Sequence, residues 1–110
     1  LAMSSAASDV YKRQLKNCGD KGLSAGELAE TKVANAVIEN SKIAVVSKDT
    51  SEVFINKLII KNISSLCLGA YKAKNNFSGS SITISKPLSN CDEKRIVSQK
   101  GSFINLNNEL

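Results

Sequence analysis

The chain has 110 residues, so it is one small domain or a piece of a larger one. It contains no histidine and no tryptophan, which excludes a Ser-His-Asp triad, a Cys-His catalytic pair and an imidazole metal site. The net charge is +5, one residue is proline and 5% of residues are aromatic. Together with abundant Asn, Ser, Ile and Val, this composition is typical of a β-rich globular protein.

The first segment of the chain resembles the translation of a sequencing-library adaptor. Every residue from 4 to 14, SSAASDVYKRQ, matches the in-frame translation of a transposase-type adaptor. The alternative interpretation is a Ser/Ala-rich cap followed by a short basic helix at residues 9–13. We treat residues 1–14 as an artefactual leader outside the fold, and residues 15–110 as the C-terminal fragment of a longer domain.

From residue 15 onward, the sequence repeats about every 22 residues. At this offset Ile38 aligns with Ile60 and Asn40 with Asn62, and residues 15–20 align with residues 37–42. Later units keep the pattern with longer spacings, because a polar loop at residues 71–80 adds length. Further aligned pairs are Val33 with Ile55, Leu23 with Val45, Ile43 with Leu66, Val53 with Ile82, and Ile82 with Ile104.

Within each unit, the apolar residues alternate with a period of two, which predicts short β-strands separated by Ser, Asn, Asp and Gly turns. The units are too short for a βαβ repeat, and a hairpin meander has no reason to keep one side-chain order. Stacked coils of a parallel β-helix do keep it, because each strand lies on its equivalent in the next coil. The predicted inward side chains are Leu23, Val33, Ile43, Val45, Val53, Ile55, Leu66, Leu68, Ile82, Ile84, Ile96, Ile104 and Leu106.

Asparagine is expected at one corner of each coil. Asn40 and Asn62 align, and Asn90 is the third predicted member. Asparagine tolerates the left-handed backbone conformation of a sharp corner, and stacked amides can hydrogen-bond in a ladder. Chance alignment in an Asn-rich chain is the alternative.

Residues 20–27 (DKGLSAGE), 43–49 (IAVVSKD) and 70–74 (AYKAK) resemble the final coils of right-handed parallel β-helix proteins of the pectate-lyase-like superfamily. The sequence departs from that pattern at Ala25, Val46 and Ala73. The expected fold is therefore all-β: a right-handed, single-stranded parallel β-helix of about three to four coils, truncated at its N-terminal side. The resemblance implies a secreted, periplasmic or cell-surface protein and, for catalytic members, acidic residues, a basic residue and often calcium.

Charged residues recur at the coil spacing and form the candidate contact surface. The ligand-binding candidates are Glu27, Lys48, Asp49, Tyr71 and Lys72. One interpretation is a patch that touches a sugar polymer; the other is a solvated column of turns with alternating charge. Calcium needs three or more converging oxygen ligands, and only two acidic residues of the column are neighbours. We therefore predict no catalytic residue, metal or cofactor in this chain, and assign calcium only to the parent protein.

The cysteines, the charge distribution and the apolar runs mainly exclude classes of site and partner. Cys18, Cys67 and Cys91 lack zinc-site spacing, and pairing Cys18 with Cys91 is geometrically poor. We expect small buried or corner residues, and the sequence leaves their redox state open. Asp20 is a candidate last member of an acidic site in the upstream coils, and residues 20–22 read as a turn. The charges are spread along the chain and no apolar run spans a membrane, so neither nucleic acid nor a membrane span is expected.

Three functions stay open. The first is a non-catalytic scaffold of a bacterial surface or secreted protein that contacts polysaccharide and the upstream coils. The second is the C-terminal part of a carbohydrate-active lyase or epimerase, whose active site lies upstream. The third is an accessory module of a spore-coat-H-type kinase protein. Because this fold hosts many activities, it does not choose among them.

Overall fold

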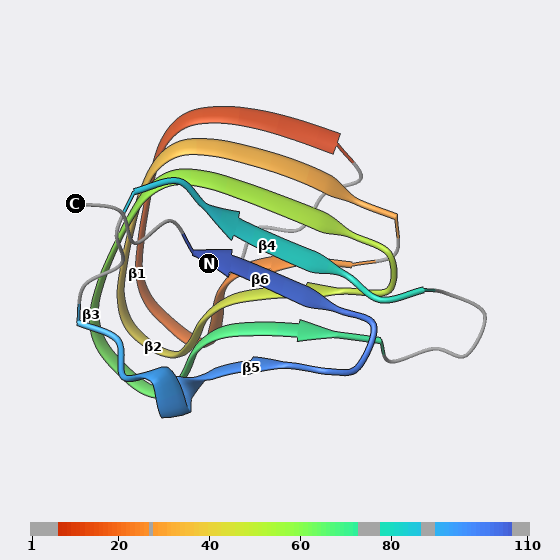
Figure 1. Cartoon of the computed structure of the whole chain (residues 1–110). Helices are drawn as coiled ribbons and strands as arrows, with labels where there is room; N and C mark the ends of the chain where they lie inside the picture. The colour runs from red at the N-terminus through yellow and green to blue at the C-terminus, as the bar shows by residue number, and fades with distance from the viewer. Residues whose placement is uncertain (1–6, 27, 73–77, 87–89, 107–110) are drawn as a thin grey trace.

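The computed structural model describes residues 7–26, 28–72, 78–86 and 90–106. Its strands are β1 (Ala7–Ala25), β2 (Glu30–Lys48), β3 (Glu52–Tyr71), β4 (Ser81–Ile84), β5 (Ile96–Ser98) and β6 (Phe103–Leu106), and a short 3-10 helix, η1 (Glu93–Arg95), precedes β5. All pairings are parallel, in the order β1-β2-β3-β4-β6, with β5 beside β3. Figure 1 shows these strands bent and stacked around one axis. The described residues form a parallel β-solenoid of about three coils without an α-helix, which confirms the predicted architecture.

The register follows the sequence repeat closely. Val33 pairs with Ile55, and Ile38 with Ile60, as the 22-residue offset predicts. The predicted alignment of Leu15 with Val37 is wrong by one residue, because Leu15 pairs with Ile38. The register shifts between Lys16 and Gly19, at the corner of the first coil. An additional corner residue thus changes the register upstream of the corner and leaves the downstream pairing unchanged.

The backbone of residues 7–14 forms the first part of β1. It pairs in register with residues 30–37 of β2. A parallel sheet edge presents backbone N–H and C=O groups, so it accepts an adjacent chain with little regard to side-chain identity. This backbone pairing does not test whether residues 7–14 derive from an adaptor. The adaptor origin therefore stays a prediction.

The core runs along the inside of the coils as columns of aliphatic side chains. Predicted inward residues that are buried are Leu23, Val33, Val45, Val53, Ile55, Leu68, Ile82 and Ile84, and Ile96, Ile104 and Leu106 are partly buried against them. Ile43 and Leu66 are only half-buried and lie outside the core cluster, so core packing is not confirmed for these two predicted inward residues. The β2–β3 register shifts between Ser41 and Ile43, directly after the asparagine corner, and this interrupts the simple alternation.

Candidate functional site

The predicted charged column divides between the surface and the interior. Lys72 is exposed and Lys48 is half-buried, whereas Asp49 is only 1% exposed. Asp49 has a φ of 55° at the corner after β2, and its N–H donates to the Tyr71 carbonyl at 3.1 Å. Lys48 and Tyr71 occupy paired positions on β2 and β3. The fifth candidate, Glu27, lies outside the described residues.

Asp20 lies within β1 rather than in a turn, so the predicted turn at residues 20–22 is wrong. Gly22 is needed for close packing, not for a left-handed backbone. A Cβ atom at Gly22 would lie 2.6 Å from Cγ2 of Ile38 and 2.8 Å from the carbonyl oxygen of Ala44. The chain passes so close to its neighbour here that only glycine fits without displacement.

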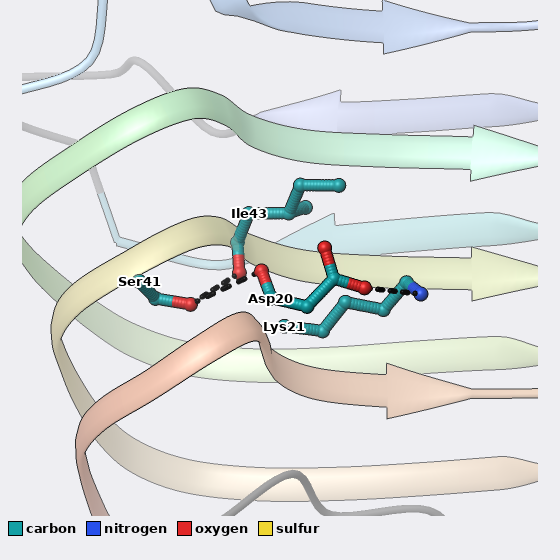
Figure 2. Close-up of polar contacts among 4 residues, drawn as sticks. All are labelled: Asp20, Lys21, Ser41 and Ile43. Carbon is teal, nitrogen blue, oxygen red and sulfur yellow. Dashed lines mark hydrogen bonds and ion pairs between the residues drawn. The ribbon is translucent and has the colours of Figure 1, made fainter.

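The Asp20 carboxylate forms an ion pair with the adjacent Lys21, whose Nζ lies 3.0 Å from Oδ2 (Figure 2). The hydrogen bond from Lys21, and then its positive charge, lower the pKa of Asp20 from its usual 3.8. Nearby, the Ser41 hydroxyl donates to the Ile43 carbonyl at 2.9 Å and lies 3.4 Å from the Asp20 carbonyl oxygen. These contacts connect β1 with β2, and the proposed role of Asp20 in an upstream acidic site stays a prediction.

Three asparagines adopt a left-handed backbone at one corner of the solenoid. Asn40, Asn62 and Asn90 have φ values of 55°, 56° and 65°. Asn62 Nδ2 donates a hydrogen bond to Asn40 Oδ1 at 2.7 Å. Asn90 follows Asn62 at the same spacing that pairs Leu68 with Ile96, so it occupies the equivalent place in the next coil.

Sequence reasoning missed a second polar column, formed by Ser51, Ser80 and Ser102. Each serine directly precedes a strand and is buried. The Ser51 hydroxyl lies 2.7 Å from the Ser47 hydroxyl and donates to the Ala25 carbonyl at 3.1 Å. The Ser80 hydroxyl donates to the Ser47 carbonyl at 2.5 Å, and the Ser80 N–H donates to the Ser102 hydroxyl at 3.1 Å. The serines follow the same spacing as the apolar residues, and this spacing could have predicted the column from the sequence.

An open groove of about 220 Å³ lies beside this serine column, and Ser51 and Ser80 take part in its lining. Its walls are residues 50–52, residues 78–81, Gly101 and Phe103. Glu52, Ser81 and Phe103 pair in succession on β3, β4 and β6, so they form one row across the strands. Phe103 is 64% exposed and Glu52 is also exposed. The groove therefore combines a carboxylate, several hydroxyl groups and a phenyl ring.

Comparison with known proteins assigns no function to the groove or to the two corners. No protein-family model, curated protein or solved structure matches the chain. Across the part of the chain that the structure describes, no three His, Cys, Asp or Glu residues gather as a metal site would require. Within the same residues, none of the helices has the length and apolar character needed to cross a bilayer.

Cys67 and Cys91 form a disulfide bond, with Cα atoms 6.2 Å apart. The cysteine spacing in the sequence does not predict this pairing, and Cys67 is fully buried, as expected for a small core residue. The bond joins β3 to the segment before η1 and so ties two successive coils together. The side chain of Cys18 lies outside the described part of the structure.

The polar loop at residues 71–80 is described at its two ends, and residues 73–77 lie outside the described residues. At one end, the Lys72 N–H donates to Gln99 Oε1 at 2.6 Å. At the other end, the Ser78 N–H donates to the Thr50 hydroxyl at 2.8 Å, and the two hydroxyl oxygens lie 2.9 Å apart. Both ends are thus attached to neighbouring coils, and the second end forms part of the groove wall.

Proposed function

We propose that this chain is a non-catalytic β-solenoid scaffold from an exported bacterial protein, and that it contacts polysaccharide. The observation that carries the proposal is the disulfide between Cys67 and Cys91. Disulfides form and persist in oxidising environments such as the periplasm and the cell exterior, and they are rare in the reducing cytosol. A bond that ties one coil to the next fits a rigid exported module.

Internal hydrogen bonding supports the scaffold role. The buried hydroxyls of Ser51 and Ser80 are bonded to Ser47 and to backbone carbonyls, so the turn corner is satisfied within the solenoid. Asn62 and Asn40 join the coils at the other corner. Coils connected in this way hold surface side chains in fixed positions, which lowers the entropic cost of binding.

We also propose that the chain belongs to the pectate-lyase-like superfamily. The parallel solenoid and the asparagine corner are the features that support it. A fold of this kind hosts enzymes and inert scaffolds alike, so the ligand is argued from surface chemistry. Hydroxyl, carboxylate and aromatic groups lie in one row at Glu52, Ser81 and Phe103, and such groups suit a sugar polymer.

The test is binding and cleavage measured on the same samples. The full chain is incubated with neutral, amino-sugar and uronate polysaccharides, each with calcium and with a chelator. We expect retention on at least one polymer, without new chain ends and without dependence on calcium. Cleavage of a uronate polymer would replace the proposal with the lyase alternative, and retention on none of the polymers would refute polysaccharide contact.

Lys72→Ala is the suitable variant for the charged column, because Lys72 is exposed. Asp49→Ala would confound binding with folding, since the Asp49 side chain is buried. Loss of binding in Lys72→Ala without a change in the unfolding midpoint would assign the contact to the charged column.

A further inference from the structure

Some polar groups of the groove beside the serine column are hydrogen-bonded within the protein, and others have no partner among the described residues. Ser51 and Ser80 line the groove, and their hydroxyls are bonded within the solenoid. Across the described residues, by contrast, neither the Glu52 carboxylate nor the Ser81 hydroxyl has a hydrogen-bond or ion-pair partner. Two polar groups on adjacent paired strands are therefore available to a ligand.

The matching position in the preceding coil shows what is particular about Glu52. Glu30 pairs with Glu52 in the register of β2 and β3, and its carboxylate lies 3.6 Å from Lys32 Nζ. In β3, the residue that corresponds to Lys32 is Phe54, so Glu52 has no such cation beside it. The repeat thus supplies an ion-paired glutamate outside the groove and an unpaired one within it.

Phe103 supplies an apolar surface next to these groups. It follows Ser81 in the row of paired positions, and 64% of its surface is exposed to solvent. Aromatic faces carry partial negative charge and attract weakly positive C–H groups. A sugar ring offers such C–H groups on its face and hydroxyl groups around its rim, which a carboxylate and a serine hydroxyl can bind.

The backbone around the groove holds these groups in place. Gly79 lies so close to Gly101 that an added Cβ atom would overlap the Gly101 backbone. Thr50 has a φ of 66°, which is uncommon for a β-branched residue, and Ser78 anchors it through backbone and hydroxyl hydrogen bonds. Uncommon backbone conformations gather at ligand sites when the surrounding contacts hold them.

We propose that this groove is a saccharide site that takes one uncharged or amino-sugar unit of a polysaccharide. The inference rests on the proposed function and adds to it the position and the ligand class. Glu52 and Ser81 bind hydroxyl or amino groups, and the ring stacks on Phe103. A volume of about 220 Å³ is below the roughly 300–1,000 Å³ of drug-sized pockets, which fits one ring-sized unit. Among the described residues that line the groove, the Glu52 carboxylate is the only charged group, so uronate units are disfavoured.

The test is calorimetric titration of the full chain with cello-, chitosan- and galacturonate oligosaccharides. We expect the cello- or chitosan oligosaccharide to bind more tightly than galacturonate. Phe103→Ala should weaken that binding about three- to tenfold, since stacking is the contact it removes. Glu52→Gln should weaken chitosan binding more than cello-oligosaccharide binding, because only the amino sugar carries a positive charge.

Two matched controls are available. Leu28→Ala removes an apolar side chain that is 65% exposed, and Glu30→Gln alters the equivalent glutamate of the preceding coil. Both should bind like the parent, and all four variants should keep the parental unfolding midpoint. If Phe103→Ala and Glu52→Gln bind normally while Lys72→Ala does not, or if galacturonate binds best, the groove assignment is overturned and polysaccharide contact survives. If none of the oligosaccharides or polymers binds, both proposals fail.

Discussion

Asn62 donates a side-chain hydrogen bond to Asn40 at 2.7 Å, although the two residues lie 22 positions apart in the chain. Both have a left-handed backbone, so each amide sits at a corner that most residues avoid. The bond connects equivalent corners of adjacent coils, and it shows that the sequence repeat is a repeat in space.

Asn62→Ala should destabilise the protein by about 1–3 kcal/mol, because alanine loses the amide bond and disfavours a positive φ. Asn62→Gly should cost under about 1 kcal/mol, since glycine adopts that backbone freely. Urea unfolding of both variants measures the difference. Equal losses would show that the amide alone stabilises this corner.

Reducing the bond between Cys67 and Cys91 should lower stability by about 3 kcal/mol, given the 24-residue separation that it closes. Thermal unfolding with and without reductant measures this loss. Cys91→Ser should unfold at the same temperature with and without reductant, whereas Cys18→Ser should keep the parental response. Alkylation of three thiols in the unreduced, unfolded chain would contradict the pairing.

Gly22→Ala should cost about 1–3 kcal/mol, because its Cβ would overlap Ile38 and the Ala44 carbonyl. Gly26→Ala is the matched control in the same coil. Its Cβ would lie 3.7 Å from Lys48 Cε, an ordinary contact, so the change should stay within about 0.5 kcal/mol. Chemical unfolding that ranks the two variants equally would argue against the close approach of β1 to β2.

Asp20 should titrate below its usual pKa of 3.8, because Lys21 stabilises the carboxylate. The ion pair contributes stability when Asp20 is ionised, and this contribution is lost as the pH falls through the lowered pKa. Lys21→Gln should raise the pKa of Asp20 toward 3.8. NMR titration of the Asp20 carboxyl carbon follows the shift, and an unchanged pKa in Lys21→Gln would rule out Lys21 as its cause.

Residues 15–110 expressed without the first 14 residues should associate or lose solubility. Removing residues 7–14 exposes the edge of β2 at residues 30–37, and unpaired parallel edges recruit other chains. Sedimentation velocity compares this protein with the full chain at equal concentration. A clean monomer of the shortened chain would refute the expectation.

Much of the architecture could be read from residue order. Val33, Ile55 and Ile84 mark strands through their alternation with polar residues, and the 22-residue offset places Val33 beside Ile55. These features are local or repeated, and each coil imposes the same pattern of inward side chains on the next. Where a corner changed length, as between Lys16 and Gly19, the repeat alone placed Leu15 one residue away from its actual partner.

The candidate site was harder to predict from the sequence than the fold. The charged column was expected from Glu27, Lys48, Asp49, Tyr71 and Lys72, yet Asp49 is buried at its corner after β2. The groove forms where residues 50–52 meet residues 78–81 and Phe103. Its residues come from three strands and the corners before them, so no contiguous sequence motif predicts the groove.

Residue order alone was sufficient for the class of fold, the parallel register of most strands and the asparagine corner, because these depend on short-range periodicity that recurs in every coil. The pairing of Cys67 with Cys91, the burial of Asp49 and of the serine column, and the row of Glu52, Ser81 and Phe103 emerged only from the folded chain. Each of these depends on how the corners and the longer third coil bring distant residues together, and that geometry is set by the packing of whole coils.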